Sequence, residues 1–235
     1  MSPAPIPPRV LRLVAVGLVA SALVAAVVPA DGAARAPPEP ACGVCVDGAL
    51  AEAAERHGVA VEVVHATLDI RVFEDGSTRW VARLHLSDGA EALRNDSLRA
   101  AVVDAATASD DGDRTSRMDG DTLVVERRRD DAAEREAGAV LFTTFHAHDP
   151  VVPFAAGGEG SVYPGADVLV LHAPEGHVVA GGVGDGAVDG RTVVWRGQEG
   201  GADGIDRDAV PTFVPEDATA PGVRGTLARL LAGVA

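Results

Sequence analysis

The clearest chemical motif in the chain is a pair of cysteines, in Cys42-Gly43-Val44-Cys45. A C-x-x-C pair ahead of a helix can have a lowered thiol pKa, because a helix N-terminus favours the thiolate, and such pairs carry out thiol–disulfide exchange. Redox enzymes of the thioredoxin type place the pair after a strand, whereas the proline-rich segment 36–40 precedes it here. Outside the cytoplasm the same spacing forms a local disulfide. We expect a disulfide between Cys42 and Cys45, with redox chemistry and with metal or intermolecular pairing as the alternatives.

A second motif places two histidines, His146 and His148, in a stretch that predicts a strand over 139–148. Side chains two residues apart on a strand point to the same face, so both imidazoles are expected side by side. Imidazoles are common ligands of transition metals, and a third ligand would complete a site. The candidates for that ligand are Asp149, His85 and His172. Because the spacing identifies none of them, a pair of surface histidines at a strand end is the alternative interpretation.

The single asparagine of the chain, Asn95, lies in Asn95-Asp96-Ser97, which matches the acceptor sequence for N-linked glycosylation. Glycosylation at Asn95 is compatible with export. The alternative is a loop residue or a helix cap, because asparagine side chains accept hydrogen bonds from backbone N–H groups at helix starts.

No other motif completes a set of catalytic or cofactor-binding residues. Residues 182–187 are glycine-rich like a dinucleotide-binding loop, but the sequence after them predicts a strand over 192–196 where that motif requires a helix. The sequence contains neither a nucleophile elbow nor an EF-hand loop. We therefore predict no cofactor.

The elements that would position these residues centre on the stretch from Val64 to Leu86, which predicts a two-stranded antiparallel hairpin. Apolar residues occupy alternate positions in both arms, as in strands with one buried and one solvated face. Pairing Val72 with Trp80 brings both apolar sets to one face and predicts a loop of residues 75–77. The apolar positions are Val64, Ala66, Leu68, Ile70 and Val72 in the first arm and Trp80, Ala82, Leu84 and Leu86 in the second.

The remaining pattern predicts an α+β fold, with an antiparallel β-sandwich or sheet, a short N-terminal helix over 47–57 and one helical insertion that opens at 87–88. Pro174-Glu175-Gly176 separates two apolar stretches and predicts a second hairpin. Hydrophobic residues make up 47% of the chain but aromatic residues only 3%, so the core must consist mainly of valine, leucine and alanine. The expected strands after the insertion cover 122–126, 139–148, 167–173, 177–181, 192–196 and 212–214.

The first 36 residues have the pattern of a targeting segment. Arg9 and Arg12 precede an apolar run, Leu13 to Val28, that falls short of the roughly 20 residues a bilayer span needs. We favour a cleaved signal peptide over an N-terminal anchor for 1–36. The rest divides into a linker with the cysteine pair and a short helix over 37–60, a β-rich domain over 61–215, and a C-terminal tail over 216–235. The tail is expected to be a packed helix or an amphipathic segment on a membrane.

Acidic residues outnumber basic ones by 35 to 20, which gives a net charge of −15, and every basic residue is an arginine. Such a surface suits concentrated salt, where a Debye length of roughly 3 Å at 1 M screens the repulsion that would otherwise weaken the fold. We therefore favour a halophilic host; the alternative is a genome rich in G and C, which favours Arg, Ala, Gly and Val codons. The sequence shows no basic stripe, so we expect no nucleic acid partner.

The run Val72-Phe73-Glu74-Asp75-Gly76-Ser77-Thr78-Arg79-Trp80 resembles a strand–turn–strand unit found in exported domains of unknown function from halophilic archaea. Arg117-Met118 and the β-rich segment from Val168 to Trp195 fit the same resemblance. It implies an extracytoplasmic domain and supplies no activity or catalytic residue. Relatives of this kind can be tethered to a membrane.

Together these features lead us to expect an exported, non-enzymatic extracytoplasmic domain, secreted or membrane-anchored, that acts as a binding or structural module. The sequence identifies no ligand and no protein partner, and a membrane tether through the N-terminal segment is possible. The alternative, from a different class, is a thiol–disulfide or metal-dependent enzyme that uses Cys42 and Cys45, or His146 and His148.

Overall fold

The computed structural model describes residues 39–107, 113–146, 162–197, 205–206 and 208–234. The predicted signal peptide or anchor at 1–36 lies outside these residues. Within them, every helix is too short or too polar to cross a bilayer.

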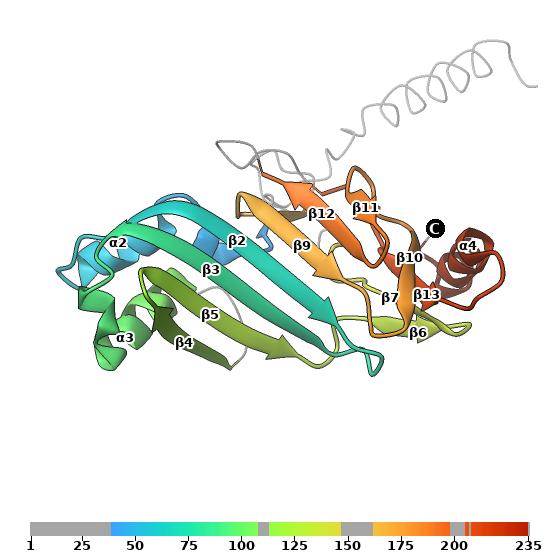
Figure 1. Ribbon diagram of the computed structural model, residues 1–235, viewed down its shortest axis with the longest axis horizontal. Coiled ribbons are helices and arrows are strands. Elements are labelled where there is room, and N and C mark those ends of the chain that lie inside the picture. Colours follow the sequence, from blue (N-terminus) through green and yellow to red (C-terminus); the bar gives the residue numbers. More distant parts are fainter. Residues whose placement is uncertain (1–38, 108–112, 147–161, 198–204, 207, 235) are drawn as a thin grey trace, which may run out of the picture.

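The chain has the predicted α+β fold with a mostly β core (Figure 1). The helices are η1 (Gly43–Cys45), α2 (Ala49–Arg56), η2 (Ala92–Arg94), α3 (Asp96–Ala106) and α4 (Pro221–Ala232). The strands are β1 (Glu39–Pro40), β2 (Glu62–Val72), β3 (Thr78–Asp88), β4 (Arg114–Asp119), β5 (Thr122–Arg129), β6 (Glu134–Glu136), β7 (Ala139–Leu141), β8 (Val162–Tyr163), β9 (Val168–His172), β10 (His177–Gly181), β11 (Ala187–Asp189), β12 (Thr192–Arg196) and β13 (Thr212–Pro215).

A seven-stranded sheet, the large sheet, has the order β11-β12-β9-β2-β3-β5-β4. The predicted hairpin forms its centre, as β2 and β3. The sheet is mixed and not purely antiparallel, because β9 pairs with β2 in parallel. That pairing joins strands about a hundred residues apart in the chain, which no local pattern in the sequence indicates.

The β2–β3 hairpin has the predicted faces but another register. Val72 pairs with Thr78 and Ile70 with Trp80, a shift of two positions along β3 from the predicted partner of Val72. The loop is residues 74–76 and not 75–77, because the N–H of Phe73 donates to the carbonyl of Ser77 at 2.9 Å. A shift by an even number keeps each side chain on its face, so Trp80 remains buried.

A second, four-stranded sheet, the small sheet, has the order β10-β13-β7-β6. The predicted hairpin around Pro174-Glu175-Gly176 is wrong: β9 pairs with β2 and β12 in the large sheet, whereas β10 pairs with β13 in the small one. The turn therefore carries the chain from one sheet to the other. The predicted strand over 139–148 is shorter than expected and ends at Leu141.

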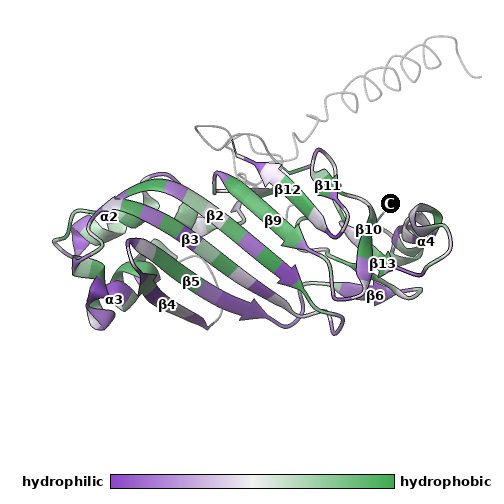
Figure 2. Cartoon of the chain, viewed as in Figure 1, coloured by the Kyte–Doolittle hydropathy of each residue, from purple (hydrophilic) through white to green (hydrophobic). Residues whose placement is uncertain are grey.

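The main core lies on one face of the large sheet, the inner face. Figure 2 shows hydrophilic and hydrophobic residues alternating along β2 and β3, and the predicted apolar positions from Ala66 to Leu86 are buried. Val64, which was predicted on the same face, is 53% exposed, because the ladder is irregular between Val63 and His65. Four aromatic rings join the two sheets: Phe142 and Phe145, which follow β7, contact Trp80 of β3, and Phe145 also contacts Trp195 of β12. The chain has few aromatic residues, and four of them lie together at one point of a mostly aliphatic core.

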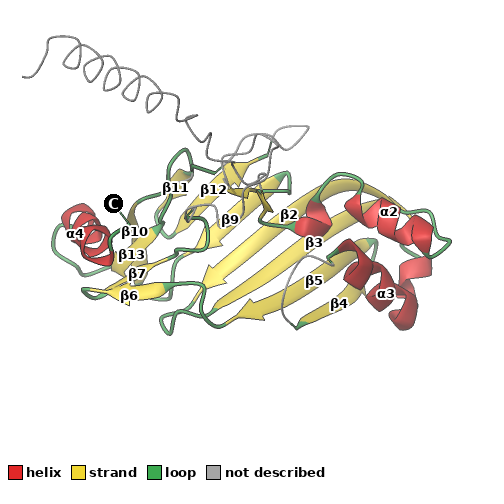
Figure 3. Cartoon of the chain, turned by 180° about the vertical axis from the view of Figure 1, so that it is seen from behind, coloured by secondary structure: helices red, strands yellow, loops and turns green. Residues whose placement is uncertain are grey.

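The helices α2 and α3 cover the same inner face at the other end of the large sheet, as the view from behind shows (Figure 3). The short helix predicted over 47–57 is α2, which begins at Ala49 with Gly48, at φ 79°, as its N-cap. The helical insertion begins later than predicted, because β3 continues through Asp88 and α3 starts at Asp96. No described helix covers the opposite, outer face of the large sheet (Figure 1).

Candidate functional site

The outer face of the large sheet carries a row of basic side chains in direct register across four neighbouring strands. Arg128 of β5 pairs with Arg79 of β3, Arg79 pairs with Arg71 of β2, and Arg71 pairs with His172 of β9. We call these four residues the basic row. Because neighbouring strands lie ~4.8 Å apart, the row extends over about 14 Å.

The alternation of the strands explains how the sequence forms the row. Three members neighbour a buried residue that points to the inner face: Val72 and Trp80 are buried next to Arg71 and Arg79, and Leu171 is buried next to His172. Burial of these apolar neighbours fixes the three basic side chains on the solvent side. The core of the large sheet therefore determines the placement of the row.

Carboxylates next to the row pair with particular members. The guanidinium of Arg79 donates two hydrogen bonds to the carboxylate of Glu126, at 2.6 and 2.7 Å. Those hydrogen bonds hold the pKa of Glu126 below its usual value. His172 lies 3.2 Å from Asp69, and this hydrogen bond, followed by the nearby Arg83, lowers the pKa of Asp69. Both carboxylates are therefore held in the charged form.

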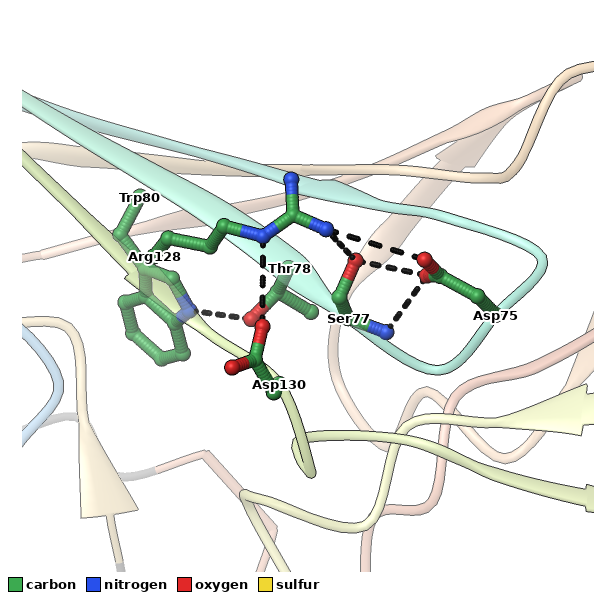
Figure 4. Close-up of polar contacts among 6 residues, drawn as sticks. All are labelled: Asp75, Ser77, Thr78, Trp80, Arg128 and Asp130. Atoms are coloured by element: carbon green, nitrogen blue, oxygen red, sulfur yellow. Dashed lines mark hydrogen bonds and ion pairs between the residues drawn. The ribbon is translucent and has the colours of Figure 1, made fainter.

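Arg128 joins the row to the loop of the hairpin (Figure 4). Its Nη2 donates to Ser77 Oγ at 2.7 Å and lies 3.7 Å from Asp75 Oδ2, while its Nε donates to Asp130 at 3.3 Å. Asp75 in turn accepts hydrogen bonds from the N–H and the hydroxyl of Ser77, at 2.9 and 2.6 Å. This network gives the end of the row a defined position.

Arg71 differs from the other members. It is exposed, and it makes no hydrogen bond and no ion pair with any residue that the structure describes. Its two neighbours in register, Arg79 and His172, are basic, so its charge meets like charge on one side and an ionisable imidazole on the other. A guanidinium stays protonated under all physiological conditions, so Arg71 cannot lose its charge.

A cavity of about 400 Å³ opens beside Arg71 and His172, away from the Arg128 end of the row. Arg191, which precedes β12, adds a further guanidinium to its wall and is oriented by a hydrogen bond to the carbonyl of Pro174 at 2.9 Å. We call this space the row cavity; it is lined by Arg71, Val72, Phe73, His172, Ala173, Glu175, Arg191 and Thr192. The wall holds two guanidinium groups and one imidazole against the single carboxylate of Glu175, so the row cavity has a surplus of the donors that a carboxylate, sulfate or phosphate group requires.

The cysteine pair lies on the inner face of the large sheet, where η1 packs against β2 and β3. Cys42 and Cys45 form a disulfide, and both are at least 94% buried. They pack in the main core with Val44 and Leu50, so residues 41–50 are part of the folded domain. Cys45 also borders a cavity of about 480 Å³, whose wall includes the ion pair between His65 and Asp167.

The proposed histidine metal site does not have the geometry on which it was based. His146 follows β7 in a bend and is not part of a strand, and His148 lies outside the described residues. Of the other candidate ligands, His172 belongs to the basic row and His85 pairs with His65 on the outer face. Among the described residues no group of three or more metal-binding side chains comes together.

Asn95 is the N-cap of α3: its side-chain oxygen accepts a hydrogen bond from the N–H of Leu98 at 3.0 Å. The residue is exposed. The cap uses the amide oxygen, whereas a glycan would be attached to the amide nitrogen.

Sequence reasoning missed the basic row because its members come from four strands between residues 71 and 172. Two signals in the sequence point to it. Arg71 and Arg79 occupy polar positions of the alternating hairpin, and Arg127-Arg128-Arg129 follows the next apolar strand. The hairpin makes the strands of Arg71 and Arg79 neighbours, but nothing in the sequence shows that the strands of Arg128 and His172 pair with them.

Comparison with protein-family models, with curated proteins and with solved structures found no match to this chain.

Proposed function

We propose that the protein is an exported, non-enzymatic extracytoplasmic domain that binds an anionic ligand at the basic row and the row cavity. The observation that carries the proposal is the position of Arg71, which has no partner among the described residues and lies in register between Arg79 and His172. The ligand class that best suits an extracytoplasmic surface of this kind is an acidic glycan.

Without a ligand, the like charges of the basic row lower the stability of the large sheet. Like charges directly opposite each other on a sheet destabilise it, by an amount comparable to the ~0.2–1 kcal/mol of a favourable pair. Glu126 and Asp69 already have cationic partners, so they offset the charge of Arg71 only in part. A carboxylate or sulfate bound between Arg71 and Arg191 would accept charge-assisted hydrogen bonds from both guanidinium groups and remove the repulsion.

The extracytoplasmic location is supported by the N-terminal sequence pattern and by the resemblance to exported domains of halophilic archaea. A halophilic host fits the net charge of −15. The row has four members, fewer than the 6–10 phosphate contacts of a strongly salt-dependent nucleic acid binder, so the proposal includes no nucleic acid partner.

The test is a binding titration of the purified protein with alginate, a polymer of uronic acids, and with neutral dextran. We expect saturable binding of alginate and none of dextran. Arg71→Gln removes one charge from the row without removing a contact, and Arg135→Gln is the matched control, an equal change of charge at an exposed position of the small sheet. We expect Arg71→Gln to weaken alginate binding at least tenfold and Arg135→Gln to leave it within twofold.

Salt provides a second criterion. Direct contacts between a guanidinium and a carboxylate are about 3 Å long, comparable to the roughly 3 Å Debye length at 1 M, so they are screened less than distant charges. We expect alginate binding to weaken with KCl but to persist at 1 M. Equal binding by the two variants, or equal binding of dextran, would show that the row is not the binding surface.

One observation favours the alternative function, thiol–disulfide exchange. Cys45 borders the cavity of about 480 Å³, which gives a substrate a route toward the disulfide. The measurement is reduction of insulin disulfides by a catalytic amount of the protein with dithiothreitol, which re-reduces the Cys42–Cys45 disulfide after each transfer of two electrons to insulin, compared with a Cys42→Ser, Cys45→Ser variant. Turnover that the variant lacks would establish this function; we expect none, because both sulfur-bearing residues are buried in the core.

A further inference from the structure

The C-terminal helix α4 presents an apolar stripe to solvent. Val223, Leu227, Leu230 and Leu231 are 72%, 50%, 61% and 60% exposed. Residues at this spacing lie on one side of a helix. The other large apolar side chains exposed to this degree in the described parts of the chain, Val64 and Val188, are single residues on different strands. The stripe is therefore a concentrated apolar surface.

The opposite side of α4 is packed. Ala228 is fully buried in a second core with Ala139, Leu141 and Val214 of the small sheet. Gly225 lies so close to β10 that a Cβ added to it would be 2.9 Å from the Cβ of Ala180. These contacts fix the rotation of the helix, so the stripe cannot turn inward to the small sheet.

The charges on α4 differ from those of the chain as a whole. Residues 221–232 contain Arg224 and Arg229 and no acidic residue, in a chain with 35 acidic residues. Both arginines are oriented by hydrogen bonds: Arg224 donates to the carbonyl of Ala137 and Arg229 to the hydroxyl of Thr212. The apolar stripe thus lies on the one α-helix among the described residues that has basic but no acidic side chains.

We propose that α4 is a membrane-surface helix, which lies in the interface of a lipid bilayer with anionic headgroups. Val223, Leu227, Leu230 and Leu231 insert between the lipids, and Arg224, at the edge of the stripe, lies next to the headgroup phosphates, while Arg229 stays on the side of the small sheet. An apolar stripe combined with basic side chains is the pattern of helices that lie in the plane of a membrane. The helix has 12 residues, too few for the roughly 20 that cross a bilayer, so it lies on the surface and does not span it.

A second copy of the chain fits the apolar stripe less well than a membrane with anionic headgroups does. Symmetric packing of two α4 helices through the stripe would bring the Arg224 of both copies to the interface without an acidic residue on either helix to pair with them. Lipid phosphates supply the missing negative charge. The acidic remainder of the surface is repelled by such a membrane, but concentrated salt limits that repulsion to a few ångströms.

The experiment uses the full chain and a fluorescent reporter on the stripe, so that the predicted N-terminal anchor cannot account for the result. Leu227→Trp places an indole within the stripe, and Val188→Trp places one at an equally exposed position on β11 as the matched control. The vesicles contain phosphatidylcholine and phosphatidylglycerol at 3:1, with bromine in the acyl chains as a quencher. Each variant is compared with the unmodified chain, which gives the contribution of Trp80 and Trp195.

We expect the added fluorescence of Leu227→Trp to be quenched at least twofold by these vesicles and that of Val188→Trp to be unchanged. An unquenched Leu227→Trp, or equal quenching of both variants, would overturn the proposal. A blue shift of Leu227→Trp that grows with protein concentration in the absence of vesicles would also overturn it, because it would show that the stripe is an interface between copies.

Discussion

Arg71 lies directly opposite Arg79 on the outer face of the large sheet, in the ladder between β2 and β3. Arg79 has a carboxylate partner in Glu126, whereas Arg71 has no partner among the described residues. The two arginines therefore have different roles: Arg79 completes an ion pair within the sheet, and Arg71 offers its charge to a ligand.

Replacing Arg71 is expected to leave the stability of the fold unchanged or to raise it. Arg71→Thr removes a like-charge pair and introduces a β-branched residue that suits a strand, so we expect a gain of up to about 1 kcal/mol in the free energy of unfolding. Arg79→Thr removes the same repulsion but also the ion pair with Glu126, which is worth about 0.2–1 kcal/mol on a surface. Urea denaturation of both variants is the measurement. A loss of more than 1 kcal/mol in Arg71→Thr would contradict the assignment of Arg71 to binding.

Acid is expected to destabilise the protein through Asp69 and Glu126. Hydrogen bonds from His172 and from Arg79 hold the pKa values of these carboxyl groups below the ordinary values of 3.8 and 4.5. A carboxyl with a lowered pKa in the folded state contributes stability that is fully present above its ordinary pKa and is lost as the pH falls through its folded-state pKa. Stability should therefore decline from about pH 4.5 downward. Urea midpoints between pH 2 and pH 6 should fall less steeply in Asp69→Asn than in the unmodified chain; parallel curves would be inconsistent with the pairing of Asp69 and His172.

The aromatic cluster is expected to dominate the contacts between the sheets. The ring of Phe145 is fully buried, and its centroid lies 4.8 Å from that of Phe142 and 5.8 Å from that of Trp195. Phe145→Ala should cost about 3–5 kcal/mol. Phe73→Ala is the control, because Phe73 is half-buried and its ring contacts the guanidinium of Arg128, an interaction worth about 0.5–1 kcal/mol. Similar losses in the two variants, measured by chemical denaturation, would argue against a cluster that joins the sheets.

Gly182 is expected to be required where β10 leaves the small sheet. Its φ is +74°, and a Cβ at this position would lie 2.1 Å from the carbonyl oxygen of Val210. Gly190 has φ +56° with open space around it, so Gly190→Ala should cost about 1–2 kcal/mol from the backbone conformation alone. Gly182→Ala should cost a further amount on the order of 1–3 kcal/mol, because the chain must shift. Thermal or urea unfolding of the pair checks this, and equal losses would contradict the close approach to Val210.

Alternation in the sequence predicted the strands and the faces of the central hairpin, including the burial of Trp80. It could not determine the register, because parity excludes odd shifts and allows every even one. The loop determines which even shift occurs. Asp75 accepts two hydrogen bonds from Ser77, and the N–H of Phe73 donates to the carbonyl of Ser77, so the chain turns one residue earlier than predicted.

The second hairpin was predicted from Pro174-Glu175-Gly176 and is wrong for a different reason. A turn shows that the chain reverses, and it does not show that the two strands pair. β9 finds its partners in β2 and β12, where Leu169 and Leu171 are completely buried, and β10 contributes to the small sheet. Which strands pair is a long-range property that depends on how the whole core packs. The basic row depends on the same pairings, because its members come from four strands.

The most direct test of the proposed binding surface is to observe its arginine side chains by NMR during a titration with alginate. We predict that the Nε–Hε signals of Arg71 and Arg191, which line the row cavity, shift in a saturable manner while that of Arg135, on the small sheet, does not move. Saturable binding of alginate that leaves the signals of Arg71 and Arg191 unchanged would contradict the account.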